Sequence, residues 1–314
     1  MFSLLNLLSG FLETGVVIFA LRNFGIKTAL FLALLYQLGN LSPYPFRISK
    51  QLATMFACIS ATLMFWCIYF PFLGLTAVPF LSLALQSVRS DMKTESSKML
   101  KRSFRTLGFL LGFGFNALLG FLCAVVVLVV LIHIKEKSLN KVFLPKFRKL
   151  QAIMILHQMH YFVYCYSAMI IAYKLGGALL AAGIFFAGWL TYIFAPFLYR
   201  KGKDYRKMFL FGHSLLTLLL LSMFFAPTIL SRAIFWLLTG IGGTTEFCIG
   251  KLEHELGHYS EINHNCSENF GHILGVTTCF LSFVLFSNIN LSILLAAGFA
   301  LTALILMSTL KIGV

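Results

Sequence analysis

The chain has 314 residues, of which 59% are hydrophobic and 11% are charged, and its formal net charge is +15. A soluble domain is typically about half apolar and about a quarter charged, so this composition excludes an ordinary soluble domain and is typical of an all-α polytopic membrane protein. The positive charge is confined to short segments between apolar runs, which is the pattern of membrane-protein loops rather than of a nucleic-acid-binding surface. We therefore expect a lipid bilayer around the chain and no nucleic acid as a partner.

Ten apolar runs have close to the ~20 residues that a transmembrane helix needs. The first run begins without the basic stretch and the cleavage site of a signal peptide, so we interpret it as a membrane span. The runs fall at about 3–21, 25–43, 51–69, 71–88, 152–173, 176–198, 208–226, 229–250, 269–286 and 288–309.

A further apolar region at 104–134 decides how many spans the chain has. As one helix it would be roughly 45 Å long, which is too long for one crossing and short for two. If it turns near Asn116, 21 of the 25 Lys and Arg residues lie on one side of the membrane; as a single span it would divide them 15 to 10. The first division fits the positive-inside rule much better. The two short helices can gain length from flanking basic residues whose stems extend to the headgroups: Lys101, Arg102, Arg105 and Lys135.

We therefore predict about twelve transmembrane helices in the inner or plasma membrane, with both termini cytoplasmic. They form a six-helix half at 1–134 and a second six-helix half at 151–314, joined by a basic cytoplasmic linker at 135–150. Two six-helix halves are the parallel-repeat arrangement of one large class of transporters.

The loops after the second and the eighth predicted spans occupy equivalent places in the two halves. They read SPYPFRISKQ (42–51) and APFLYRKGKDYRK (195–207). Both resemble the G-x-x-x-D-R-x-G-R-R loop of the major facilitator superfamily, although Phe46 and Tyr199 stand at the position of its Asp. The matching residues are Arg47 and Lys50 in the first loop and Arg200, Gly202 and Lys203 in the second.

This resemblance, together with the two six-helix halves, covers essentially the whole chain. It implies a major-facilitator-like fold that transports a substrate by alternating access. It also implies that the two loops are conformational gates and that spans 1, 4, 7 and 10 line a central cavity.

A few polar residues lie inside the spans that the resemblance places around the cavity. Ionisable side chains within a membrane are costly and usually functional. In the seventh span, His and Tyr residues follow one another at i, i+3, i+4 and i+7, which is one face of a helix. The candidate substrate-binding or proton-coupling residues are Glu13, Gln86, His157, His160, Tyr161, Tyr164 and Glu246.

These residue types suit proton-coupled transport of an organic solute. A carboxylate and a histidine in a partly dehydrated cavity can exchange protons near neutral pH, and tyrosines offer an apolar wall with a hydroxyl donor. The alternative is structural: Glu13 and the two histidines would be hydrogen-bonded packing groups, and Glu246 would lie at the membrane interface.

Residues 252–264 read LEHELGHYSEINH and contain H-E-x-x-H, the zinc motif of many metallopeptidases. On a helix the motif places His254 and His258 one turn apart on one face, with Glu255 as the general base. His264 matches the third ligand of a longer form of the motif. The segment therefore indicates a possible zinc site.

The predicted topology argues against that site, because Lys251 to about Glu268 then form a short polar loop on the cytoplasmic side. Glu261 also stands where the longer motif needs Gly. We expect a solvated, hydrogen-bonded loop with no cofactor, and keep zinc binding as the alternative.

Three functions follow from these observations. The first is a monomeric secondary transporter, proton-coupled, that moves a small organic and amphipathic solute, with export favoured over uptake. The second is an intramembrane zinc metallohydrolase that uses the HELGH segment. The third is a membrane scaffold without transport activity.

Overall fold

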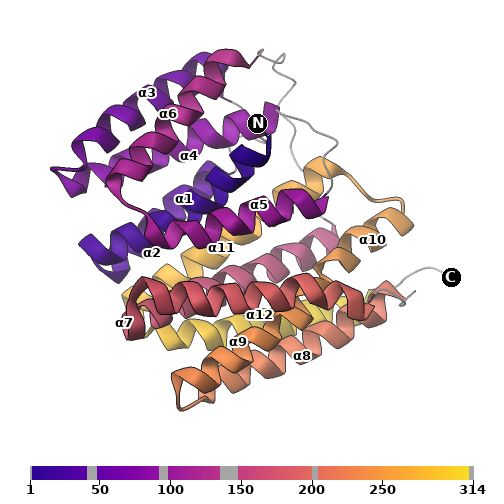
Figure 1. Cartoon of the computed structure of the whole chain (residues 1–314). Coiled ribbons are helices and arrows are strands. Elements are labelled where there is room, and N and C mark those ends of the chain that lie inside the picture. Colours follow the sequence, from indigo (N-terminus) through magenta and orange to yellow (C-terminus); the bar gives the residue numbers. More distant parts are fainter. Residues whose placement is uncertain (1, 41–47, 92–97, 135–147, 200–203, 311–314) are drawn as a thin grey trace. The chain divides into compact units, whose positions relative to one another are not determined.

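The computed structural model describes residues 2–40, 48–91, 98–134, 148–199 and 204–310, and within these ranges all regular structure is helical (Figure 1). The chain divides into two compact units, Met1–Leu144 and Pro145–Val314. Each unit has its own set of helices and its own buried polar residues.

Within the residues that the structure describes, the first unit contains six α-helices. Helix α1 packs against α2 and α5, and α3 packs against α4 and α6 (Figure 1). Short 3₁₀ turns precede α4 (Pro71–Leu73) and follow α5 (Gly112–Gly114). The helices are α1 (Phe2–Asn23), α2 (Ile26–Gly39), α3 (Lys50–Trp66), α4 (Gly74–Asp91), α5 (Lys98–Leu111) and α6 (Ala117–His133).

The backbones of α1 and α5 lie very close together because glycines face each other across the contact. A Cβ atom added to Gly10 would lie 1.9 Å from the Arg105 carbonyl oxygen, and one added to Gly108 would lie 1.8 Å from the Leu7 carbonyl oxygen. Small residues at helix contacts allow this approach within membranes. The contact places side chains of α5 next to the buried face of α1.

The region at 104–134 forms two helices, α5 and α6, as the charge distribution predicts. The chain turns at Gly112–Gly114, and the Asn116 side chain then caps α6 by accepting a hydrogen bond from the Leu119 amide at 2.9 Å. Asn is one of the favoured N-cap residues. Helix α5 begins at Lys98 rather than near 104, so it carries part of the basic segment on its first turns.

The second unit begins with a long helical segment, α7 (Lys149–Tyr199), which is interrupted at Gly176 and Gly177. Gly177 has φ 70°, a conformation that glycine adopts without strain. The interruption divides α7 where the sequence predicts a boundary between two spans. The remaining helices are α8 (Tyr205–Phe225), α9 (Ile229–Gly243), α10 (Phe247–Glu255), α11 (Glu261–Phe286) and α12 (Ile289–Ser308).

These helices form one packed bundle. Helix α7 packs against α9, α11 and α12, and α8 packs against α9 and α12 (Figure 1). Between α9 and α10 the chain forms a 3₁₀ turn, η3 (Thr244–Glu246), inside the single apolar segment Ile229–Glu255. A 3₁₀ stretch in the middle of a helix often marks a functional position.

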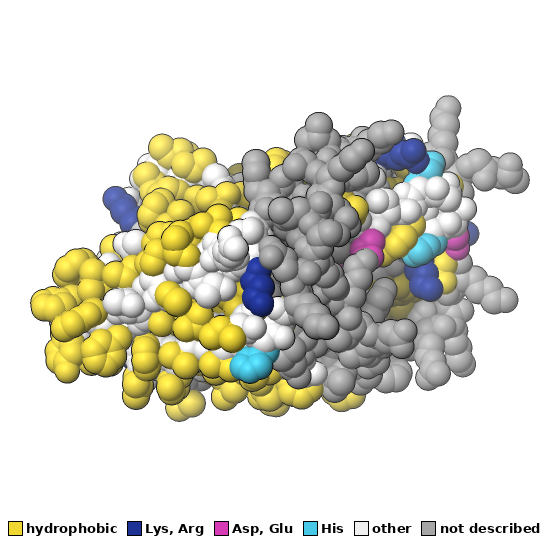
Figure 2. All heavy atoms as spheres, turned by 90° about the horizontal axis from the view of Figure 1, so that it is seen from above, with side chains coloured by type: hydrophobic (Ala, Val, Ile, Leu, Met, Phe, Trp, Pro, Cys, Tyr) yellow, Lys and Arg dark blue, Asp and Glu magenta, His cyan; other side chains and the backbone are white. Residues whose placement is uncertain are grey.

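Seven helical segments are long and apolar enough to cross a membrane, judged by length and composition within the described ranges. Two shorter apolar helices, α2 and α6, add to them. Figure 2 shows hydrophobic side chains over much of the described surface with few charged groups between them. Such a surface suits contact with lipid. The full number of about twelve spans stays a prediction.

Candidate functional site

Glu13 lies in the middle of α1 and is buried, with 4% of its surface exposed. Arg105 of α5 donates a hydrogen bond to Glu13 Oε2 at 2.9 Å, and Gln37 of α2 donates to Glu13 Oε1 at 3.2 Å. Asn40 donates in turn to the Gln37 side-chain oxygen. The carboxylate thus has a charged and a neutral donor, as buried ionised groups require.

This ion pair changes the expected role of Arg105. The sequence predicts that Arg105 extends to the headgroups, but its guanidinium turns to Glu13 and is about one third exposed. The close contact of α1 and α5 brings this buried carboxylate within reach of Arg105. Gln86, the other candidate in this unit, is buried in α4.

Of the predicted gate residues, Lys50 is described. It is the first residue of α3, and its ammonium donates to the Ile132 carbonyl oxygen at 3.3 Å and to the Ile134 carbonyl oxygen. A cation at a helix C-terminus is stabilising, so Lys50 ties the start of α3 to the end of α6. The other four predicted gate residues lie outside the described residues: Arg47, Arg200, Gly202 and Lys203.

In the second unit, three buried histidines meet between α7 and α8. His157 Nδ1 lies 3.0 Å from His213 Nε2 and 3.2 Å from His160 Nε2. Each imidazole is at most 2% exposed. Among the described residues, these three histidines form the group that could hold a metal ion, because their ligand atoms all lie within 4.8 Å of one another. We call His157, His160 and His213 the histidine triad.

The triad is held by polar partners from η3. The Thr245 hydroxyl donates to the Gly242 carbonyl oxygen at 2.6 Å and lies 3.2 Å from His213 Nδ1. Glu246 Oε2 lies 3.9 Å from His157 Nε2. The break in the apolar segment therefore presents a hydroxyl and a carboxylate to the histidines.

Aromatic side chains line the other side of the triad. The Tyr164 ring is parallel to that of His160, with centroids 6.0 Å apart, and the Trp236 ring lies 5.2 Å from Tyr164. Tyr161 makes an edge contact with Tyr164 at 5.6 Å. The structure thus brings together all the candidate residues of this unit, His157, His160, Tyr161, Tyr164 and Glu246.

Sequence reasoning missed three members of this site: His213, Thr245 and Trp236. His213 is a lone ionisable residue within the apolar run at 208–226, which is itself an indication of function. Thr245 and Trp236 give no comparable indication, because hydroxyl and aromatic residues are common in membrane helices. Only the packing of α7, α8 and α9 reveals them.

No family model and no curated protein matches the chain. Solved structures do match it over nearly its whole length. The nucleoside transporter NupG has a TM-score of 0.59 at 13% identity, covering 99% of this chain and 98% of that one, and a mutant form of NupG has 0.60 at 12%, covering 99% and 100%. A mutant form of the Escherichia coli fucose:proton symporter FucP has 0.55 at 10% identity, covering 99% and 98%.

The chain shares the fold of these transporters, a major-facilitator-like fold. The resemblance inferred from the two loops is therefore confirmed at the level of the fold. With its apolar helices, this major facilitator fold makes the chain a multi-pass membrane protein. The matching solved structures are transporters rather than enzymes.

Within this major facilitator fold, the HELGH segment does not form a zinc-protease helix. Helix α10 ends at Glu255, and the chain turns at Gly257, which has φ 65°. His254 and His258 are therefore not on one helical face. The His254 ring instead stacks on Tyr259, with centroids 3.8 Å apart.

The polar loop predicted at 251–268 is also shorter than expected, because α10 and α11 leave only 256–260 between them. The reason is a buried polar contact: Glu253 Oε2 lies 2.7 Å from His264 Nδ1, and Gln151 of α7 donates to Glu253 Oε1 at 2.8 Å. Glu253, not Glu255, is the buried carboxylate of the segment. This contact holds the ends of α10, α11 and α7 together.

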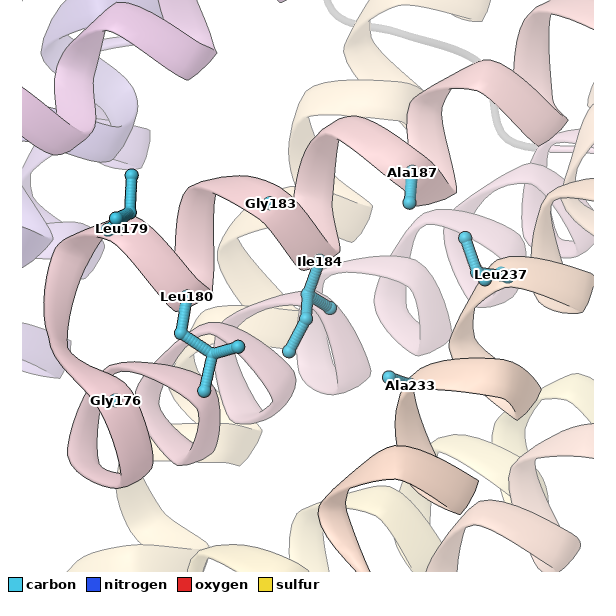
Figure 3. A pocket seen from close by; sticks show the side chains of 8 residues that line it. All are labelled: Gly176, Leu179, Leu180, Gly183, Ile184, Ala187, Ala233 and Leu237. Atoms are coloured by element: carbon cyan, nitrogen blue, oxygen red, sulfur yellow. The ribbon is translucent and has the colours of Figure 1, made fainter.

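A pocket on the second unit lies between the second part of α7 and α9 (Figure 3). Its lining is wholly apolar, so it offers no group that could recognise a polar solute. The lining residues are Gly176, Leu179, Leu180, Gly183, Ile184, Ala187, Ala233 and Leu237. Leu179 is 86% exposed, which suits contact with a lipid chain rather than a transport site.

Proposed function

We propose that this protein is a proton-coupled secondary transporter that moves a small organic solute across the membrane, with export as the expected direction. One observation carries the proposal: a buried histidine triad joins two apolar helices of a major facilitator fold. Buried ionisable groups are rarely kept in such helices without a function.

The triad supports proton coupling through its hydrogen bonds. Because the Thr245 hydroxyl gives its hydrogen to Gly242, its oxygen accepts the Nδ1–H of His213. The Nε2 of neutral His213 then faces His157 Nδ1 as a bare nitrogen at 3.0 Å. A proton between these two nitrogens stabilises the contact, and the nearby Glu246 carboxylate compensates the added charge.

The Glu13–Arg105 pair offers a second step that responds to protons. A proton on Glu13 removes the negative charge that binds Arg105. Protonation of Glu13 is therefore coupled to release of the Arg105 side chain of α5 from Glu13 of α1. Tyr164 and Trp236 provide amphipathic surface beside the triad for an organic solute. Glu13, His157, His160 and Glu246 belong to spans 1, 7 and 10, which the family resemblance places around the cavity.

A metabolite comparison inside and outside cells with and without the gene would identify the solute. The purified protein would then be reconstituted into liposomes, and flux measured with and without an imposed pH gradient. We expect Glu13→Gln to abolish gradient-driven flux and Glu255→Gln, an exposed control, to preserve it. The opposite pattern would contradict the proposal, and a protein without flux that tolerates both changes would be a scaffold.

A further inference from the structure

The histidine triad has the geometry of a metal-ligand set. In a tetrahedral zinc site with Zn–N bonds of about 2.0–2.1 Å, neighbouring ligand nitrogens lie roughly 3.3 Å apart. His213 Nε2 and His160 Nε2 lie 3.0 and 3.2 Å from His157 Nδ1. The ligand atoms of the three residues all lie within 4.8 Å of one another, so one ion could contact all three after the rings adjust.

Hydrogen bonding to protein groups cannot satisfy this arrangement when the three rings are neutral. His213 Nε2 is bare because its Nδ1–H is donated to Thr245. If His157 Nδ1 carries a hydrogen, it can align with His213 or with His160 but not with both. If His157 Nδ1 carries no hydrogen, its lone pair repels the lone pair of His213 Nε2. A single proton thus serves one contact, whereas a metal ion accepts all three lone pairs.

The surroundings orient two of the three rings, those of His213 and His157, as metal-binding histidines are usually oriented, whereas His160 Nδ1 is buried without a hydrogen-bond partner. A ligating histidine generally donates its second ring N–H to a hydroxyl, carbonyl or carboxylate. Thr245 has this role for His213, and Glu246 lies toward His157 Nε2, on the ring edge opposite the ligand atom. Both partners come from η3, so the break between α9 and α10 serves this geometry.

We propose that His157, His160 and His213 bind one divalent transition-metal ion of the zinc class. Imidazole nitrogens suit Zn²⁺, Co²⁺, Ni²⁺ and Cu²⁺, whereas Mg²⁺ and Ca²⁺ prefer oxygen ligands. Three protein ligands leave the fourth position open to water or to a solute. The inference rests on the triad's geometry alone and does not require that the protein transports anything.

Binding would be measured on the full-length protein in detergent, with any polyhistidine tag removed and with metal stripped by a chelator. Titration with Co²⁺ should produce the visible absorption bands of a four-coordinate site, saturating at one ion per chain, and Zn²⁺ should displace it. His213→Gln should weaken binding at least 100-fold, while the exposed His258→Ala should leave it unchanged.

A second pair of variants tests the orienting hydroxyl. Thr245→Val should weaken Co²⁺ binding by about 10- to 100-fold, and Thr245→Ser, which keeps the hydroxyl, should restore it. Elution volume and melting temperature would show that each variant is folded. Absence of saturable binding, or binding that is lost in His258→Ala and kept in His213→Gln, would overturn the proposal. Because these are binding measurements, their outcome is separate from the flux assay.

Discussion

A buried carboxylate needs compensation, and at Glu13 that compensation comes from one arginine and one amide. Removing one partner of such a pair leaves an uncompensated charge in an apolar helix contact. Arg105 is about one third exposed, so water offsets part of the cost. The same interaction therefore stabilises the contact between α1 and α5.

We predict that Arg105→Gln destabilises the protein by roughly 2 kcal/mol. The double variant Glu13→Gln/Arg105→Gln should be less destabilised than the sum of the two single changes, because no unpaired charge is left. Thermal unfolding in detergent measures all three variants. Additive effects would show that the 2.9 Å contact makes no net contribution.

Glu253 and Glu255 provide a matched comparison within the HELGH segment. Glu253 is fully buried and contacts Gln151 and His264, whereas Glu255 is exposed at the end of α10. We expect Glu253→Ala to lower stability by about 2 kcal/mol, since it removes the partner of the buried Gln151 amide and of the partly buried His264 ring.

The control, Glu255→Ala, should change stability by less than about 0.5 kcal/mol, as surface substitutions usually do. Thermal unfolding of both variants under one set of conditions decides the comparison. An equal loss in both would mean that the carboxylate–histidine contact at α10 and α11 is not stabilising.

In the described part of the second unit, glycines accompany two breaks in helical structure, at Gly176–Gly177 in α7 and at Gly240–Gly243 before η3. The first turns the chain between two spans, and the second leads into the turn that presents Thr245 to the histidine triad. Local sequence thus sets the geometry of the site as directly as the histidines do.

We predict that Gly177→Ala destabilises the protein by about 1 kcal/mol, because φ 70° is strained for a residue with a Cβ. Gly183→Ala is the control: it lies on the same segment, and its added Cβ would have no atom within 4 Å. That change should be neutral or stabilising because Ala favours helix. Equal melting temperatures for the two variants would contradict this account of the break.

The sequence predicts the helices of this fold well and their partners poorly. Apolar runs and charge locate the elements, including the division of 104–134 into α5 and α6. Helical spacing also identifies the polar face of α7. It does not reveal which other helix meets that face, so His213, 56 positions from His157, and Arg105, 92 positions from Glu13, were missed as partners. Both contacts depend on packing between helices distant in sequence.

At the scale of the whole molecule, the placement of basic residues predicts the orientation of every loop. With twelve spans, Lys251 faces the cytoplasm and Arg232 faces the opposite side, so the loops at either end of the segment Ile229–Glu255 lie on different sides of the membrane. Pro227 and His258 are exposed in these two loops. The segment between them is long and apolar enough to span the bilayer.

Single cysteines at these two positions test the orientation directly. In a Cys58→Ser background, which removes the exposed native thiol, we expect His258→Cys to react with a membrane-impermeant maleimide only from the cytoplasmic side. Pro227→Cys should react only from the opposite side. Nine spans precede Pro227 in the twelve-span topology, and an even number of spans up to this point would exchange the two results. Labelling of Pro227→Cys from the cytoplasm would therefore contradict that topology. Labelling of both from one side would show that Ile229–Glu255 does not cross the membrane.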